Sequence, residues 1–182
     1  MTCIVGIEHD GGVTIGGDSC ITTGGTYSLS AEPKVFRVGE LLLGMSGDVS
    51  ALQAIRYGLA VPEWPEGMEI HAWMASRLRP ALMAVTKAAA LSQSNGGKET
   101  HSAWIIVGVR GQAWEVASDG AMTRSRNGYE SIGSGYEVAL GALAVATGTP
   151  EERALAALQA AEKHVPSVRG PFTVETLERA VT

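Results

Sequence analysis

The stretch MTCIVGIEHDGGVTIGGDSC, residues 1–20, decides the fold that this sequence predicts. Apolar runs at 3–7 and 13–16 flank a polar turn with a Gly-Gly pair, which is the pattern of a β-hairpin. The first strand thus begins almost at the first residue, whereas the ends of most chains are frayed and dispensable. We therefore expect this terminus to have a function of its own.

Outward from this hairpin, the chain alternates between groups of strands and groups of helices. We expect hairpins at 34–38 with 41–45 and at 103–109 with 112–117, a short strand after 118–120, and helices at 49–59, 68–91, 136–146 and 150–164. Pro80 should kink the second helix. Residues 19–33 and 92–100 are polar and are expected to be loops, the first with a short strand at most. The tail from residue 172 fits a strand or a short helix.

Hairpins imply antiparallel sheets, and paired helices imply a helical layer on a sheet face. The simplest arrangement is an α+β fold, a four-layer αββα sandwich of two packed antiparallel sheets with a helix pair outside each. The chain has 182 residues, of which 45% are hydrophobic, so one domain over 1–182 is expected.

The composition argues against several classes of function. A net charge of −5 disfavours nucleic acid and anionic membranes as partners, because both require a basic surface. The sequence shows no signal peptide and no apolar run long enough to span a bilayer, so we expect a cytoplasmic protein. Cys3 and Cys20 are expected to be reduced core thiols rather than a disulfide.

The common cofactor and metal motifs are absent. We find no GxxxxGK[ST] loop, no GxGxxG after a strand, no HExxH and no GxSxG. The histidines are scattered without ligand spacing: His9, His71, His101 and His164. We therefore expect neither a metal nor a cofactor.

Thr2 is the remaining candidate for chemistry. A free α-amine has a pKa of about 7.7–8.0, so it can act as the base that activates the hydroxyl of its own residue. Thr2 becomes the first residue once Met1 is removed, which a small penultimate side chain permits. The strand that follows would hold it rigidly, and a nearby cation would keep the amine's proton affinity low.

Five motifs recur together along most of the chain: TCIVGI (2–7), GVTIGGD (12–18), PKVFRV (33–38), LLGMSGD (42–48) and SIGSGYEVALGAL (131–143). In this order and spacing they resemble the N-terminal-nucleophile (Ntn) hydrolases, above all the proteasome β subunits and the bacterial HslV peptidase. The αββα sandwich expected above is also that family's fold.

The resemblance implies a role for each matching residue. Thr2 would be nucleophile and base, Asp18 would orient the lysine and the terminal amine, and Lys34 would lower the pKa of the threonine site. Gly47 would donate its backbone N–H to the oxyanion, and Ser134 would hydrogen-bond the terminal amine. For the substrate, Met45 would floor the pocket for the residue before the scissile bond, with Ser46 and Thr22 beside it.

The resemblance also implies a threonine endopeptidase in a self-compartmentalising homo-oligomeric ring, acting on polypeptides threaded by a separate AAA+ ATPase unfoldase. Each residue has a structural reading as well: Thr2 as the ordinary residue after the start Met, Asp18 as a turn acid, Lys34 as a solvated strand lysine, and GMSG and GSG as tight turns.

Two features depart from the family pattern. A second acid is usual in the last helix, where ungapped comparison places Glu162 or Lys163. Pro166, Gly170 and Pro171 stand where HslV-type chains have a cation-binding loop, so we predict no metal there.

Two alternative functions stay open. The first is a non-catalytic assembly protein on the same fold, with Met1 retained. The second is a small-molecule Ntn amidase or acylase. A variant of the second makes Cys3 the nucleophile, which would require the loss of Thr2 as well as Met1.

Overall fold

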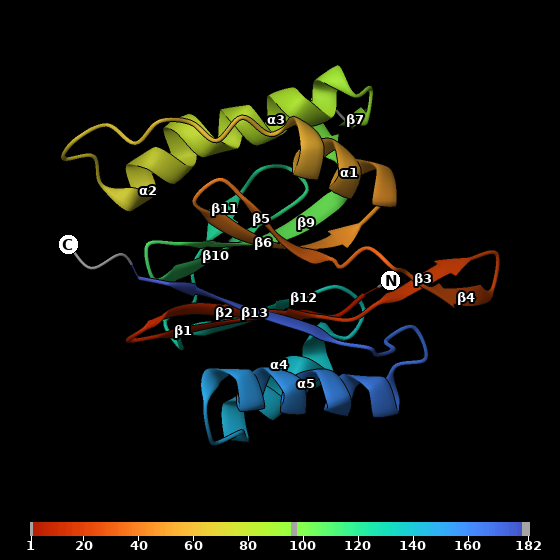
Figure 1. Ribbon diagram of the computed structural model, residues 1–182. Helices are drawn as coiled ribbons and strands as arrows, with labels where there is room; N and C mark the ends of the chain where they lie inside the picture. The colour runs from red at the N-terminus through yellow and green to blue at the C-terminus, as the bar shows by residue number, and fades with distance from the viewer. Residues whose placement is uncertain (1, 96–97, 180–182) are drawn as a thin grey trace.

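The computed structural model describes residues 2–95 and 98–179. Two antiparallel sheets form its centre (Figure 1). The first sheet has the strand order β12 (Tyr129–Ile132), β1 (Ile4–His9), β2 (Gly12–Gly17), β13 (Thr173–Glu178). The second has the order β11 (Met122–Thr123), β10 (Gln112–Val116), β9 (Ala103–Val109), β6 (Leu41–Gly47), β5 (Val35–Val38).

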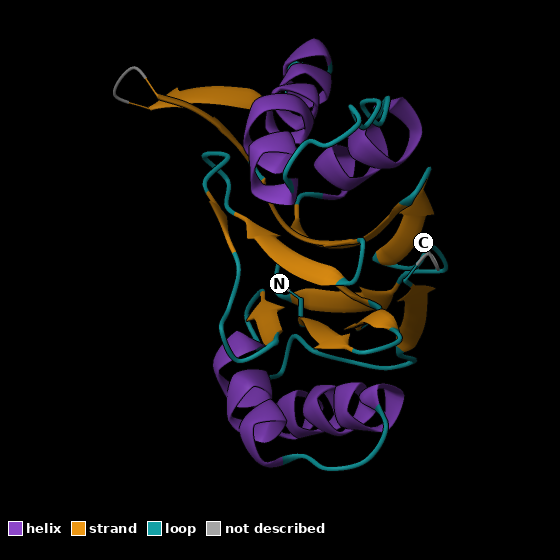
Figure 2. Ribbon diagram, turned by 90° about the vertical axis from the view of Figure 1, so that its left-hand side faces the viewer, coloured by secondary structure: helices purple, strands orange, loops and turns teal. Residues whose placement is uncertain are grey.

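Helices cover the outer face of each sheet, and Figure 2 shows the four resulting layers. The first sheet carries α4 (Tyr136–Val145) and α5 (Pro150–His164). The second carries α1 (Val49–Gly58), α2 (Ile70–Trp73), a π-helical turn η1 (Met74–Leu78) and α3 (Arg79–Ala88). The predicted αββα sandwich is therefore confirmed. Within the described residues, no helix is both long and apolar enough to cross a membrane.

Strand alternation explains how the N-terminal stretch organises these layers. Cys3, Val5 and Ile7 are buried in the cluster beneath α4 and α5. Ile4 faces the opposite way, into the cluster between the two sheets. Because successive side chains of a strand point to opposite faces, a single apolar run contributes to both cores. The first strand, β1, is thus fixed at the centre of the sandwich.

The last helix was located well by its sequence. α5 begins at Pro150 and ends at His164, as predicted. Thr149 and Glu152 form a reciprocal capping box at its start, which satisfies two otherwise unpaired backbone N–H groups. Proline suits the first turn because its missing N–H is not needed there. The tail, left open between strand and helix, forms β13.

Two segments that were predicted to be loops form strand pairs instead. Residues 19–33 contain a hairpin of β3 (Cys20–Thr23) and β4 (Thr26–Leu29). Its Gly24-Gly25 turn has positive φ at both positions, as a type I′ hairpin turn requires. Residues 92–100 likewise contribute to β7 (Ser92–Asn95) and β8 (Lys98–His101), which pair with each other. Residues 92–100 contain no large apolar residue, and in 19–33 the large apolar residues Tyr27 and Leu29 are exposed, so no buried apolar alternation signalled either pairing.

The effect of Pro80 is local. The helical run covers 70–88 rather than 68–91, and the π-helical turn lies directly before the first turn of α3, where Pro80 sits. A wider turn is one way in which a helix accommodates the lost N–H and the ring of a proline.

Candidate active site

Thr2 lies at the head of β1 and is only 3% exposed. Its backbone nitrogen donates to Ser134 Oγ at 3.1 Å, and its carbonyl oxygen accepts from Gly135 N at 3.1 Å. Ser134 and Gly135 belong to the short connection between β12 and α4. Residues far apart in the chain thus hold both polar backbone groups of Thr2.

Lys34, directly before β5, aims its side chain at the same residue. Its Nζ donates to Thr2 Oγ1 at 2.9 Å, to Asp18 Oδ1 at 2.9 Å and to the Cys20 carbonyl at 2.5 Å. An ammonium has three N–H donors, so its hydrogen-bonding capacity is filled. The lysine is therefore held in one position with its charge against the threonine hydroxyl.

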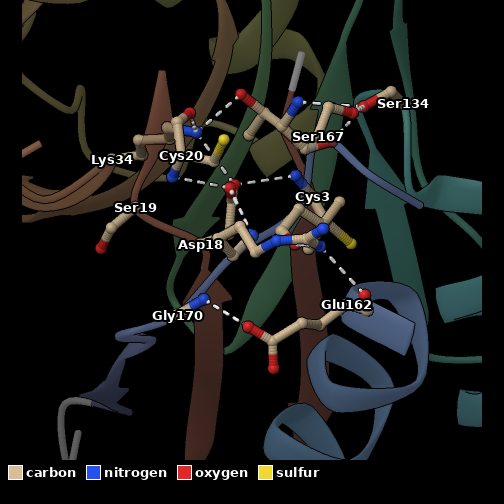
Figure 3. Close-up of polar contacts among 12 residues, drawn as sticks. Cys3, Asp18, Ser19, Cys20, Lys34, Ser134, Glu162, Ser167 and Gly170 are labelled. Atoms are coloured by element: carbon tan, nitrogen blue, oxygen red, sulfur yellow. Dashed lines mark hydrogen bonds and ion pairs between the residues drawn. The ribbon is translucent and has the colours of Figure 1, made fainter. Parts of the chain in front are cut away.

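Asp18, directly after β2, connects the parts of this site (Figure 3). Its Oδ1 accepts from Lys34 Nζ and from Cys3 N, both at 2.9 Å. Its Oδ2 accepts from Cys20 N at 2.9 Å and, at a longer 3.5 Å, from Arg169 N. The carboxylate is fully buried, and a buried charge is tolerated when it is paired and hydrogen-bonded in this way.

A small pocket of about 30 Å³ opens beside Thr2. Met45 and Gly47 of β6 line it together with Lys34. Gly47 has a φ of +129°, and a Cβ there would lie 2.0 Å from the Ser102 carbonyl oxygen, so only glycine fits. Thr2, Met45 and Gly47 line the same pocket, so the predicted nucleophile, pocket floor and oxyanion donor lie together.

The other two residues predicted to bind substrate do not line this pocket. Ser46 alternates with Met45 and Gly47 along β6, so its side chain points to the opposite face. Thr22 lies on β3, opposite Tyr27. Their roles remain predictions.

Ser167 is the site residue that the sequence reasoning missed. It is buried in the connection between α5 and β13, and its Oγ lies 2.9 Å from Ser134 Oγ (Figure 3). Glu162, a predicted position for a second acid, instead accepts from Gly170 N at 2.8 Å. Lys163 is exposed on α5. The group beside Ser134 is thus a hydroxyl rather than a carboxylate. No local sequence motif identifies Ser167 as part of the site.

Cys3 is poorly suited to be a nucleophile. Burial raises the pKa of its thiol to about 12, so the thiol is protonated at neutral pH, whereas the thiolate is the reactive form. Its side chain packs in the cluster beneath α4 and α5. Cys3 and Cys20 are both free and buried, as the sequence predicted.

The arrangement limits where the proton of Thr2 Oγ1 can go. As an ammonium with three engaged N–H groups, Lys34 can stabilise negative charge on Oγ1 but cannot accept its proton. The nitrogen of Thr2 itself is adjacent, and it is basic only as a free amine. Met1, whose removal would free it, lies outside the described residues.

Comparison with known proteins shows the fold and not the sequence family. No protein-family model and no curated protein matches the chain. Thiobacillus denitrificans BPH matches with a TM-score of 0.83 and 17% identity, over 99% of this chain and 100% of its own. HslV from Trypanosoma brucei matches with a TM-score of 0.71 and 19% identity, over 97% and 99%. Anbu, an ancestral beta-subunit from Yersinia bercovieri, gives 0.66 and 16%, over 98% and 82%.

Proposed function

We propose that this chain, which has the proteasome-like Ntn-hydrolase fold, is a threonine peptidase subunit whose nucleophile is Thr2 after removal of Met1. The observation that carries the proposal is the 2.9 Å contact between Lys34 Nζ and Thr2 Oγ1. Burying a lysine charge against the threonine at the start of the first strand costs free energy, and packing alone gives no reason for it. It is useful where a hydroxyl must lose its proton.

The proposed reaction uses the two polar groups of Thr2 in turn. The free amine takes the Oγ1 proton as Oγ1 bonds to the substrate's carbonyl carbon. The peptide C–N bond then breaks, and its nitrogen leaves with the proton held by the Thr2 amine. Water hydrolyses the resulting ester and restores the threonine.

The remaining residues support this reaction. Lys34 stabilises charge on Oγ1, Asp18 fixes the lysine, and Ser134 holds the Thr2 nitrogen. The Gly47 N–H stabilises the oxyanion. Removal of one such donor raises the activation free energy by roughly 3–4 kcal/mol. The ester intermediate forms at the mouth of the pocket floored by Met45.

The assembly that we propose rests on the family resemblance of the sequence motifs together with the shared fold. HslV, BPH and Anbu share the fold, so we propose a homo-oligomeric ring in the cytoplasm that degrades polypeptides delivered by an AAA+ ATPase. The size of the particle in solution tests the ring, because a monomer would contradict it.

A threonine-directed epoxyketone tests the chemistry. One neighbouring structure is that of Thiobacillus denitrificans BPH in complex with epoxomicin, which makes this compound the first probe. We expect a covalent adduct on Thr2 of the wild type, no adduct with Thr2→Ala, and full labelling with the matched control Thr123→Ala, whose residue is exposed on β11. Labelling of Thr2→Ala at the wild-type rate would contradict the assignment.

One observation favours a second candidate, a non-catalytic assembly protein. The hydroxyl of Ser134 is hydrogen-bonded to the Ser167 hydroxyl, where the family pattern would place an acid. This candidate requires that Met1 be retained, so the intact mass of the protein from its own host separates the two functions.

A further inference from the structure

We propose that Arg169 is a built-in cation, whose guanidinium fills a cage of main-chain carbonyls at the end of α5 and holds the Ser167 loop against the Thr2 site. The loop comprises residues 165–171. The effect on turnover rests on the proposed function, whereas the effect on the loop does not. Arg169 would be a positioning residue, since it does not touch Thr2 Oγ1.

The cage consists of three carbonyl oxygens around one nitrogen. Arg169 Nη1 lies 3.1 Å from the Glu162 oxygen, 3.3 Å from that of Val165 and 2.7 Å from that of Val168. This nitrogen has only two N–H groups, so the three oxygens must share them. The arrangement is that of a positive charge surrounded by oxygens rather than of separate directional hydrogen bonds.

The position of the cage suits a positive charge. α5 has 15 residues and ends at His164, so its last carbonyls lack intrahelical partners and carry the negative end of the helix dipole. Hard cations are bound by carbonyl oxygens in such settings. Here Nη1 already occupies the centre, so the residues present do not fit a free cation of the kind that HslV-type chains bind in this loop.

The caged loop touches the candidate site on two sides. The backbone of Arg169 accepts from Ser19 N at 2.9 Å and donates to Asp18 Oδ2 at 3.5 Å. Two residues earlier, Ser167 Oγ lies 2.9 Å from Ser134 Oγ, and Ser134 Oγ accepts a hydrogen bond from Thr2 N. Figure 3 shows how Gly170 and Glu162 close the loop below Asp18. Loss of the central charge should therefore misplace both Asp18 and Ser134.

Arg169→Met removes the charge and keeps a side chain of similar length, so it should open the cage to an inorganic cation. The mature protein, freed of Met1, is assayed in choline chloride and in NaCl, KCl or CaCl2 at equal ionic strength. In choline chloride we expect epoxyketone labelling of the variant to slow roughly 100-fold, as small misplacements at a site can do, and its Tm to fall by several degrees. At least one metal ion should restore both.

The controls separate this mechanism from general damage. Wild type and Arg126→Met, which alters an exposed arginine, should respond equally little to the exchange of choline for a metal ion. Arg169→Lys keeps a positive charge and should depend on added ions less than Arg169→Met does.

Two results would overturn the proposal. One is an Arg169→Met variant with the wild-type Tm and labelling rate in choline chloride. The other is a damaged or unfolded variant that none of the three ions restores. If the wild type never labels, the proposed function fails, but the ion-dependent Tm of Arg169→Met still tests the built-in cation.

Discussion

Lys34 Nζ lies 2.9 Å from Thr2 Oγ1 and the same distance from Asp18 Oδ1, so one ammonium joins the candidate nucleophile to a buried carboxylate. Thr2 and Asp18 flank strands of the first sheet, whereas Lys34 precedes a strand of the second. The site therefore exists only when the two sheets are packed together.

Replacing Lys34 with Met should cost both stability and reactivity. The change leaves the Asp18 carboxylate buried without its counter-ion, which typically costs about 3–5 kcal/mol in the free energy of unfolding. Epoxyketone labelling should be lost as well. Urea unfolding measures the first effect and intact mass the second.

A double-mutant cycle checks that the loss arises from this pair. Adding Asp18→Asn to Lys34→Met removes the unpaired charge, so the double variant should be more stable than the sum of the single effects predicts. Simple additivity would contradict a coupled ion pair.

Gly47→Ala should disrupt the end of β6. Its φ of +129° and the 2.0 Å approach of a Cβ to the Ser102 carbonyl leave no room for a side chain, and such strain costs about 1–3 kcal/mol. Labelling should fall as the proposed oxyanion donor moves. Gly141→Ala in α4 is the matched control, because a Cβ there meets nothing within 4 Å, and it should stabilise the helix by about 0.5–1 kcal/mol. Equal behaviour of the two variants would refute the argument.

Ser167→Ala should slow labelling less than Ser134→Ala does. Ser167 is linked to the Thr2 nitrogen through Ser134, and a lost hydrogen bond of about 1 kcal/mol corresponds to roughly a fivefold change in rate. The exposed Ser28 gives the matched Ser→Ala control. The double variant should resemble Ser134→Ala alone. A Ser167→Ala enzyme that labels at the wild-type rate would exclude the serine from the site.

The Cys3 thiol should make stability depend on alkaline pH. Its pKa rises from an ordinary 9.0 to about 12 through burial, so between these values the folded state keeps a proton that the unfolded chain has lost. The free energy of unfolding must then fall as pH increases through this window, by up to about 1.4 kcal/mol per pH unit. Urea titrations at pH 8.5 and 10 should show a smaller fall for Cys3→Ala than for wild type. Identical pH slopes would contradict a buried protonated thiol.

The sequence predicted the sandwich because its core strands carry a clear signal. Apolar runs such as 3–7 and 103–109 alternate with glycine-containing turns, and these runs form both core sheets. The hairpin β3–β4 was missed because its strands are only four residues long and largely exposed, so packing contributes little to their pattern.

The candidate site likewise has a part that the sequence predicts and a part that it does not. Thr2, Asp18 and Lys34 flank predicted strands, so the motifs placed them correctly relative to the fold, and the structure brings them within hydrogen-bonding distance. Ser167 could not be placed, because the path of its loop depends on contacts of the Arg169 side chain with the carbonyls of Glu162 and Val168. Such long-range polar contacts have no period in the sequence.

The most direct test of the central claim is the intact mass of the protein purified from its own host, before and after epoxyketone treatment, with the adduct located by peptide mapping. We predict that Met1 is absent and that the adduct lies on Thr2. A chain that keeps Met1 and never acquires the adduct would contradict the account, because a Thr2 nitrogen tied in a peptide bond cannot act as the base.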